Sequence, residues 1–316
     1  MNKIEIDDKY LPAIGRIFTP VVMDSIALNG HSAYLSEVCS NCGILQHIDS
    51  SMSLGQFFDF IYDIIFKKRR NEYIYKNAIA NKILLGKHSL NTSHMLTEFR
   101  AGRCKADVVV VNGTSTVYEI KSELDSFNRL ENQIQAYLKV FDHTNVITSV
   151  SKADKLKTLL PNAVGILALT NRNTITTVRK SKSNKKNIDQ GILFDSLRKT
   201  EYLKVVEKYF KTAPDVPNTV IYKECRKLFY KIPPEIAHDL TIKILKNRRK
   251  TKILREFIKK APSSLSAYAM TICNEKPKML TLLNAFSSSI GSTLFPESIQ
   301  EEFTCITHIS GANNSN

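Results

Sequence analysis

The stretch that most constrains this chain is a run of β-branched residues at 106–111, with the sequence ADVVVV. Four consecutive valines are typical of a strand buried on both faces, because branched side chains fit a pleated sheet and leave no polar face for water. The turn pair Asn112-Gly113 follows directly. Residues 115–121 then predict a second strand, so a buried β-hairpin is expected here.

The segments around this hairpin predict an α/β domain at residues 71–180. Apolar residues at helical spacing favour a helix at 71–85. The other expected strands are 95–100, 145–149, 164–169 and 174–179, and the other expected helices are 126–141, capped by Asp125 or Ser126, and 152–160. The order helix, three strands, helix, strand, helix, strand, strand predicts a mixed central sheet flanked by helices.

Helical regions are expected on both sides of this domain. Residues 1–70 read as a helical N-terminal segment, and residues 188–310 read as a helical C-terminal region with its first helix at 193–211. No apolar run reaches the length of a membrane-spanning helix. The first ten residues, MNKIEIDDKY, are too charged for an export signal. We therefore expect a cytoplasmic protein without a membrane partner.

The charge balance favours a polyanionic partner. The chain has 45 Lys and Arg against 30 Asp and Glu, a formal net charge of +15. Lysines and arginines gain affinity for nucleic acid by displacing counterions from phosphates. Basic clusters at 67–70, 179–186 and 246–252 are candidate backbone contacts, although such runs are usually solvated surface. A basic protein without a nucleic-acid role is the alternative.

Cysteine spacing gives little support for a zinc site. Cys39 and Cys42 form the one close pair among six cysteines, with His31 and His47 nearby in sequence. A structural zinc ion usually takes four ligands from two such pairs. Reduced, partly buried thiols are the favoured interpretation.

The chemistry-bearing residues lie on the predicted hairpin. Asp107 is on its first strand, and Glu119 and Lys121 are on its second. Residues two apart on a strand project from one face, so Glu119 and Lys121 are expected together. Carboxylates on neighbouring strands can hold a hard cation such as Mg²⁺ or Mn²⁺. A lysine beside them can orient water or stabilise charge on a phosphate, which predicts a phosphodiester substrate.

The length of the hairpin loop tests this site. A two-residue loop, Asn112-Gly113, would pair Ala106 with Glu119 and leave Asp107 on the wrong face. A three-residue loop, Asn112 to Thr114, pairs Asp107 with Glu119 directly. The site therefore predicts an odd-length loop or a bulge.

These residues resemble the signature of the PD-(D/E)xK nuclease superfamily, in which an Asp is followed by an (Asp/Glu)-x-Lys strand. Here eleven residues separate Asp107 from Glu119-Ile120-Lys121, and Ala106 replaces the usual proline. Gln133 and Tyr137 resemble the QxxxY helix of the RecB-like and lambda-exonuclease-like branches. The stretch 71–150 is also similar to little-characterised bacterial and phage proteins placed in the superfamily.

The resemblance implies a fold and further site residues. It implies a restriction-endonuclease-like core, with Asp107 and Glu119 as metal ligands and Gln133 and Tyr137 assisting. Glu72 resembles the acidic residue that the first helix often supplies, so it is a third expected metal ligand. Glu98 could add to the metal site or face away. Arg100, Arg103 and Arg129 are weaker candidates for phosphate contact.

The function expected from the sequence is a metal-dependent nuclease that hydrolyses nucleic acid. DNA is favoured over RNA through the resemblance alone, as is a role in phage or mobile-element conflict. Two alternatives stay open. One is a non-catalytic nucleic-acid-binding protein with the same fold, and the other is an interaction module that binds a protein partner. A homo-oligomer is also open.

Overall fold

The computed structural model describes residues 6–49, 51–86, 93–246, 248, 252–272 and 275–294. Contacts divide the chain into two compact units. Residues 1–69 and 253–316 form the first, which we call the helical unit, and residues 70–252 form the second, the sheet unit. The expected regions were 1–70, 71–180 and 188–310. The structure differs by joining the two terminal regions into one unit and by placing residues 181–252 in the unit that contains the sheet.

The helical unit is built around one amphipathic helix, α4. Its α-helices in the described part of the chain are α1 (Leu11–Arg16), α2 (Pro20–Asn29), α3 (Ala33–Asn41), α4 (Leu54–Lys68), α12 (Lys252–Lys260), α13 (Ser266–Thr271), α14 (Lys276–Ser287) and α15 (Ile290–Leu294). Phe58 of α4 lies against Phe18, with ring centroids 5.9 Å apart, and against Phe286 of α14, 6.0 Å apart. The period of α4 predicts its apolar face but not which distant segment covers it, and this is why the sequence did not predict the pairing.

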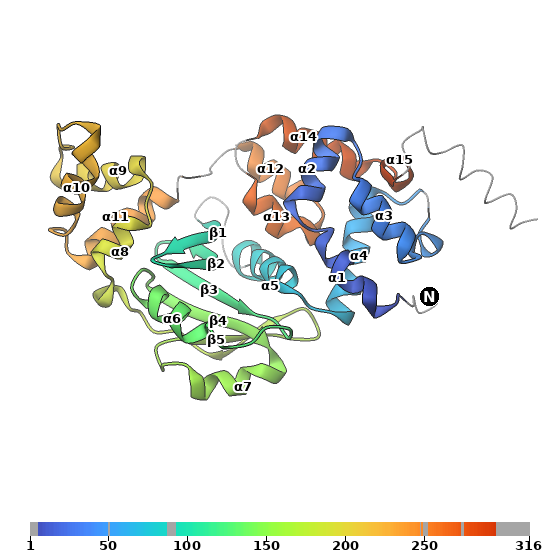
Figure 1. Cartoon of the computed structure of the whole chain (residues 1–316), viewed down its shortest axis with the longest axis horizontal. Helices are drawn as coiled ribbons and strands as arrows, with labels where there is room; N and C mark the ends of the chain where they lie inside the picture. Colours follow the sequence, from blue (N-terminus) through green and yellow to red (C-terminus); the bar gives the residue numbers. More distant parts are fainter. Residues whose placement is uncertain are drawn as a thin grey trace, which may run out of the picture. The chain divides into compact units, whose positions relative to one another are not determined.

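The sheet unit contains one six-stranded mixed sheet in the order β1-β2-β3-β4-β5-β6 (Figure 1). Its strands are β1 (His94–Ala101), β2 (Cys104–Val111), β3 (Ser115–Lys121), β4 (His143–Ser149), β5 (Gly165–Leu169) and β6 (Ile175–Arg179). The β3–β4 and β4–β5 pairs are parallel, and the other neighbours are antiparallel. The expected mixed sheet flanked by helices is confirmed, and β3 has the expected bounds.

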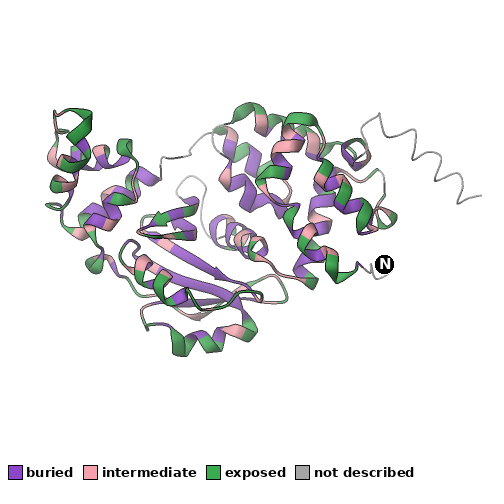
Figure 2. Ribbon diagram, in the orientation of Figure 1, coloured by how far each residue is buried: buried purple, intermediate pink, exposed green. Residues whose placement is uncertain are grey.

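Helices cover both faces of this sheet. They are α5 (Glu72–Ala78), which continues as a π-helical stretch at Ile79–Leu85, α6 (Leu130–Leu138) and α7 (Val150–Leu159). In Figure 1, α5 lies on one side of the strands and α6 and α7 on the other. Figure 2 shows that the central strands are buried along their length. β6, an edge strand, has no fully buried residue.

Helix α6 starts later than expected. It begins at Leu130, with Arg129 at its N-cap, rather than at 126. The Asp125 carboxylate accepts hydrogen bonds from Ser122 N at 2.9 Å and from Ser122 Oγ at 2.6 Å. Asp125 therefore closes the turn after β3 instead of capping the helix, so the N-cap prediction is wrong.

Four further helices pack on the same core as the sheet. They are α8 (Gln190–Asp195), α9 (Lys199–Phe210), α10 (Asn218–Phe229) and α11 (Pro234–Leu245). Phe194 and Phe229 belong to one apolar cluster with Val109 and Val117 of the sheet. The single helix expected at 193–211 is thus two helices. The Glu201 carboxylate accepts from Arg198 N at 2.8 Å, and this contact caps the second one.

We also compared the helices with the requirements of a membrane span. Over the described ranges, no single helix is both long and apolar enough to cross a bilayer. The bent pair Asp8–Arg16 and Pro20–Asn29, at 62°, meets the criterion only when joined.

Candidate active site

The hairpin register places Asp107 opposite Glu119. Val108 pairs with Tyr118 and Val111 with Ser115, so the loop between β2 and β3 has three residues. The odd-length loop predicted from the sequence is confirmed. The β2–β3 pairing stops at Val108, and beyond it Asp107 Oδ2 accepts a hydrogen bond from Ile120 N at 2.7 Å. The Asp107 side chain thus takes the place of a backbone acceptor where the two strands separate.

Glu98 joins Asp107 from the other side. In the β1–β2 register, Thr97 pairs with Val108 and Phe99 with Ala106, so Glu98 falls opposite Asp107 without pairing. Its φ of 52° lies in the left-handed region, which is uncommon for residues other than glycine. The ladder is interrupted on both sides of Asp107, and this interruption opens the sheet at the site.

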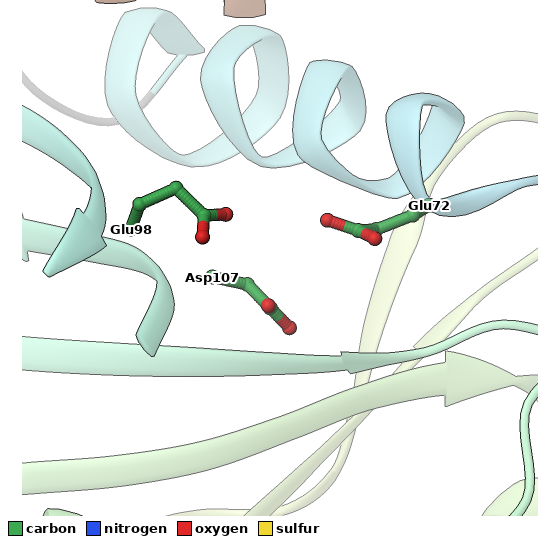
Figure 3. Close-up of side chains that lie close together, drawn as sticks. All are labelled: Glu72, Glu98 and Asp107. Carbon is green, nitrogen blue, oxygen red and sulfur yellow. The ribbon is translucent and has the colours of Figure 1, made fainter. Parts of the chain in front are cut away.

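Three carboxylates converge at this opening. Glu72, Glu98 and Asp107 each offer an oxygen within 4.8 Å of the others, and Figure 3 shows them between α5 and the strands. Glu72 is the first residue of α5, which Asn71 caps by accepting from Ile74 N at 3.2 Å. The expected pairing of Glu72 with Asp107 is therefore present, and Glu98 adds a third acid.

Lys76 is a site residue that the sequence analysis missed. Its Nζ lies 2.6 Å from Glu72 Oε1 and 3.2 Å from Glu98 Oε1. The four-residue spacing between Glu72 and Lys76 on one helix is the signal that could have found it. The ammonium group partly balances the charge of the acids.

Glu119 and Lys121 share a face, as predicted, and both are buried. Lys121 Nζ lies 3.0 Å from Glu119 Oε1 and donates to Gln133 Oε1 at 2.9 Å. The Tyr137 hydroxyl donates to Glu119 Oε2 at 2.7 Å. Gln133 and Tyr137 thus fix the Glu119–Lys121 pair from α6, and their assisting role in a reaction stays a prediction.

Glu119 departs from one expectation. It was expected as a metal ligand with Asp107 and Glu72, but it is outside the group of acids whose oxygens lie within 4.8 Å. Its two oxygens are instead engaged by Lys121 and Tyr137. Glu98 occupies the third position, and the sequence could not settle this because it does not reveal the left-handed turn of β1.

Burial makes two of the carboxyl groups, Asp107 and Glu119, hard to ionise. Burial, with the nearby Glu119 carboxylate second, raises the pKa of Asp107 to about 7, and the Ile120 N–H opposes the shift. Burial also raises the pKa of Glu119, against the effects of Lys121 and Tyr137. Such raised carboxyl pKa values are common where a site awaits a cation or moves a proton.

The three arginine candidates lie elsewhere on the surface. Arg100, Arg103 and Arg129 are all exposed. Arg100 Nε donates to Gly102 O at 3.2 Å in the β1–β2 turn, and Arg129 stands at the N-cap position of α6 without a side-chain capping bond. The described contacts bring none of them to the acids, so their role as phosphate contacts stays a prediction.

A second polar cluster has the composition of a nucleophilic site but lacks access. Ser115 Oγ lies 2.8 Å from His238 Nε2, and His238 Nδ1 lies 3.1 Å from Asp239 Oδ1. Ser115 is 2% exposed and His238 0%, so no substrate reaches the hydroxyl. Ser115 Oγ also accepts from Asp142 N at 3.0 Å. The cluster ties α11 to the start of β3, and we assign it a structural role.

The cysteine pair fits the thiol interpretation. Cys39 and Cys42 are buried and form no disulfide, and burial raises the pKa of both thiols. Among the described residues, the acids at Asp107 are the group able to hold a metal ion, and neither His31 nor His47 joins a cysteine in one.

Comparison with known proteins places most of the chain in one family. Residues 66–269, well over half of the chain, match the family described as bacteriophage P4 protein cII. No curated protein matches. Among solved structures, a protein of unknown function from Silicibacter pomeroyi aligns with 38% of this chain and 76% of its own, at 20% identity and a TM-score of 0.30.

Proposed function

The chain belongs to the bacteriophage P4 protein cII family, and we propose that its sheet unit is a metal-dependent nuclease that hydrolyses phosphodiester bonds, preferably of DNA. The observation that carries the proposal is the convergence of Glu72, Glu98 and Asp107 within 4.8 Å where β2 and β3 separate. Lys121, which lies on the neighbouring strand, supplies the positive charge that such a reaction needs.

The donor set fits a hard divalent cation. Magnesium and manganese prefer carboxylate oxygens, and three acids with one raised pKa lose their mutual repulsion when a cation joins them. Glu72, Glu98 and Asp107 would hold the ion, and Glu119 would need to leave Lys121 or Tyr137 to contribute. When bound, the metal would polarise a phosphoryl oxygen and lower the pKa of water.

The remaining residues act on charge and position. The Lys121 ammonium can donate to a phosphate oxygen and stabilise the negative charge that builds up during attack by water. Glu119 and Gln133, each within 3.0 Å of Lys121 Nζ, hold that ammonium in place. Tyr137 fixes Glu119 in turn. This arrangement supports the resemblance to the PD-(D/E)xK superfamily and its restriction-endonuclease-like core.

The family name adds a biological setting to the proposal. Its namesake is a bacteriophage protein. Together with the net charge of +15, this favours a nucleic-acid substrate in a bacterial cytoplasm, where phages and other mobile elements compete.

The test is cleavage of linear, circular and single-stranded DNA, and of RNA, with Mg²⁺ or Mn²⁺. The wild type is compared with Asp107→Ala and Lys121→Ala. Asp154→Ala is the matched control, because Asp154 pairs with Lys157 on the surface of α7. We expect metal-dependent cleavage that both site variants lose and the control keeps.

Two results would count against the proposal. Cleavage that persists in Asp107→Ala would place the activity elsewhere. The other is no cleavage under any condition, together with nucleic-acid binding that both site variants retain. It would favour the non-catalytic binding protein.

A further inference from the structure

The outer surface of α10 combines exposed cations with tyrosine rings. The helix buries one side, formed by Ile221, Cys225 and Phe229, in the core of the sheet unit. Its other side and the turn after it form what we call the α10 face, which consists of Tyr222, Lys223, Arg226, Lys227, Tyr230 and Lys231. In Figure 1, α9 and α10 lie at the edge of the unit, beyond α8 and α11.

Positive charge dominates this part of the unit. Residues 198–231 contain nine Lys and Arg against four Asp and Glu. One of the four acids, Glu201, is buried and paired with Arg248. Lys227 pairs with Glu224 and Arg226 pairs with Asp195, but Lys223 and Lys231 form no ion pair within the described parts of the chain. The α10 face is therefore a net cation surface that attracts phosphates.

The two tyrosines of the α10 face are exposed yet held in place. Tyr222 is 48% exposed and Tyr230 47%. The Tyr222 ring lies edge-on to Phe194, at 5.2 Å, and its hydroxyl donates to Asp195. The Arg226 guanidinium lies 5.2 Å from the centre of the Tyr230 ring. Rings held in this way lose little conformational entropy when they bind a flat partner.

Glycine at 191 makes room for one of these rings. A Cβ at Gly191 would lie 1.9 Å from the Tyr230 hydroxyl oxygen, so any side chain there would displace the ring. The position of the Tyr230 ring thus depends on Gly191, which has no side chain.

We propose that the α10 face binds single-stranded nucleic acid. Lysines on this face pair with phosphates, and the tyrosine rings stack on unpaired bases. Single strands fit better than duplex, because a duplex keeps its base faces stacked against each other. The inference rests on the proposed function for the class of polymer, but it concerns a surface separate from the acids at Asp107.

The test measures binding without cleavage. Asp107→Ala protein in EDTA is titrated into a labelled single-stranded oligonucleotide at several salt concentrations, and fluorescence anisotropy is read. Lys223→Gln with Lys227→Gln removes two cations from the α10 face. Lys155→Gln with Lys157→Gln is the matched control, because Lys157 pairs with Asp154 three residues away as Lys227 pairs with Glu224. Tyr230→Leu and Tyr230→Phe test stacking, and circular dichroism verifies folding.

Distinct results are expected for charge and for stacking. The lysine pair should lower the slope of log affinity against log salt by about 1.4, since each phosphate contact on a single strand contributes about 0.7. Tyr230→Leu should weaken binding about tenfold with the slope unchanged, while Tyr230→Phe keeps the affinity.

Three outcomes would overturn the inference. They are an unchanged slope in the Lys223 and Lys227 variant, equal losses in the control, and duplex that competes as well as single strand. Failure of the nuclease proposal is read separately. If the wild type does not cleave but the α10 face binds single strands, the nuclease proposal fails and this inference stands. If the wild type cleaves but the α10 face does not bind, this inference fails and the nuclease proposal stands.

Discussion

The two ends of strand β3 both bury polar groups, but they differ in how well those groups are stabilised. At its start, Ser115 contacts His238 and Asp142, and each partner is satisfied by hydrogen bonds. At its end, Glu119 lies near Asp107. Burial raises the pKa of both acids, and the Glu119 carboxylate raises the pKa of Asp107 further. The first end stabilises the fold, whereas the second stores electrostatic repulsion that a cation would relieve.

The difference teaches where to look for function on one strand. A buried polar group whose partners are all present usually holds structure together. A buried acid that is hard to ionise, beside a break in the strand pairing, lowers the stability of the fold. Its presence therefore points to a function. The following predictions test that contrast, starting with the largest expected effect.

Asp107→Ala should abolish cleavage while the protein stays folded. Loss of a metal-holding carboxylate removes several kcal/mol of transition-state stabilisation, about a thousandfold in rate or more. Initial cleavage rates at saturating Mg²⁺ measure this effect, and thermal unfolding confirms the fold. A rate within tenfold of wild type would break the contrast, because the end of β3 would then not be catalytic.

His238→Ala should destabilise the sheet unit by about 3 kcal/mol, because it leaves a cavity and removes one hydrogen-bond partner of the buried Ser115 hydroxyl. Urea unfolding measures the loss. Cleavage per folded molecule should not change, which separates the two ends of β3. A drop in cleavage at full folding would assign the Ser115 end a role in chemistry.

Without metal, stability should fall as pH rises past the unfolded pKa of Asp107. The pKa of Asp107 is about 7 in the folded protein, against its ordinary value of 3.8. The folded state therefore binds the proton more tightly, and its advantage is complete below 3.8 and lost by about 7. Asp107→Asn should remove this dependence and raise the unfolding free energy at pH 8 by about 2 kcal/mol.

Magnesium should cancel the higher unfolding free energy of Asp107→Asn at pH 8. We expect the ion to stabilise the wild type, whose Asp107 carboxylate can bind it, more than the variant. Unfolding in EDTA and in Mg²⁺, each at pH 5 and pH 8, gives the comparison. Equal pH profiles for wild type and Asp107→Asn in EDTA would contradict the stored repulsion at this end of β3.

Glu98→Gln should weaken Mn²⁺ binding about tenfold, since one charged ligand becomes neutral while the shape is kept. Isothermal titration calorimetry measures the affinity without any cleavage. Glu123→Gln is the control, because Glu123 follows the end of β3 and pairs with Arg70. If Glu98→Gln binds Mn²⁺ as wild type does, Glu119 regains the place of third ligand.

The sequence predicted the hairpin and the places of Asp107, Glu119 and Lys121 on it, because both depend on local rules. Valine content predicts a buried strand, and the odd loop length places Asp107 opposite Glu119 through the two-residue period of a strand. Gln133 and Tyr137 were found through their resemblance to the QxxxY motif, and their spacing of one helical turn predicts that they share a face. Each of these inferences needs only neighbouring residues.

The rest depends on geometry that neighbours do not encode. The left-handed φ of Glu98 is imposed by the sheet around it, since nothing in its residue type favours it. His238 meets Ser115 across 123 positions of sequence. The pairing of α4 with α14 likewise joins segments whose amphipathic patterns would fit many partners.

That last pairing has a consequence for synthesis of the chain. The helical unit is discontinuous, with the whole sheet unit between its two parts. On the ribosome, Phe57 and Phe58 emerge long before α14, which covers Phe58. At 5–20 residues per second the delay is roughly ten to forty seconds. The sheet unit can fold in that interval, whereas the nascent N-terminal helices keep an apolar surface uncovered until the last helices are synthesised.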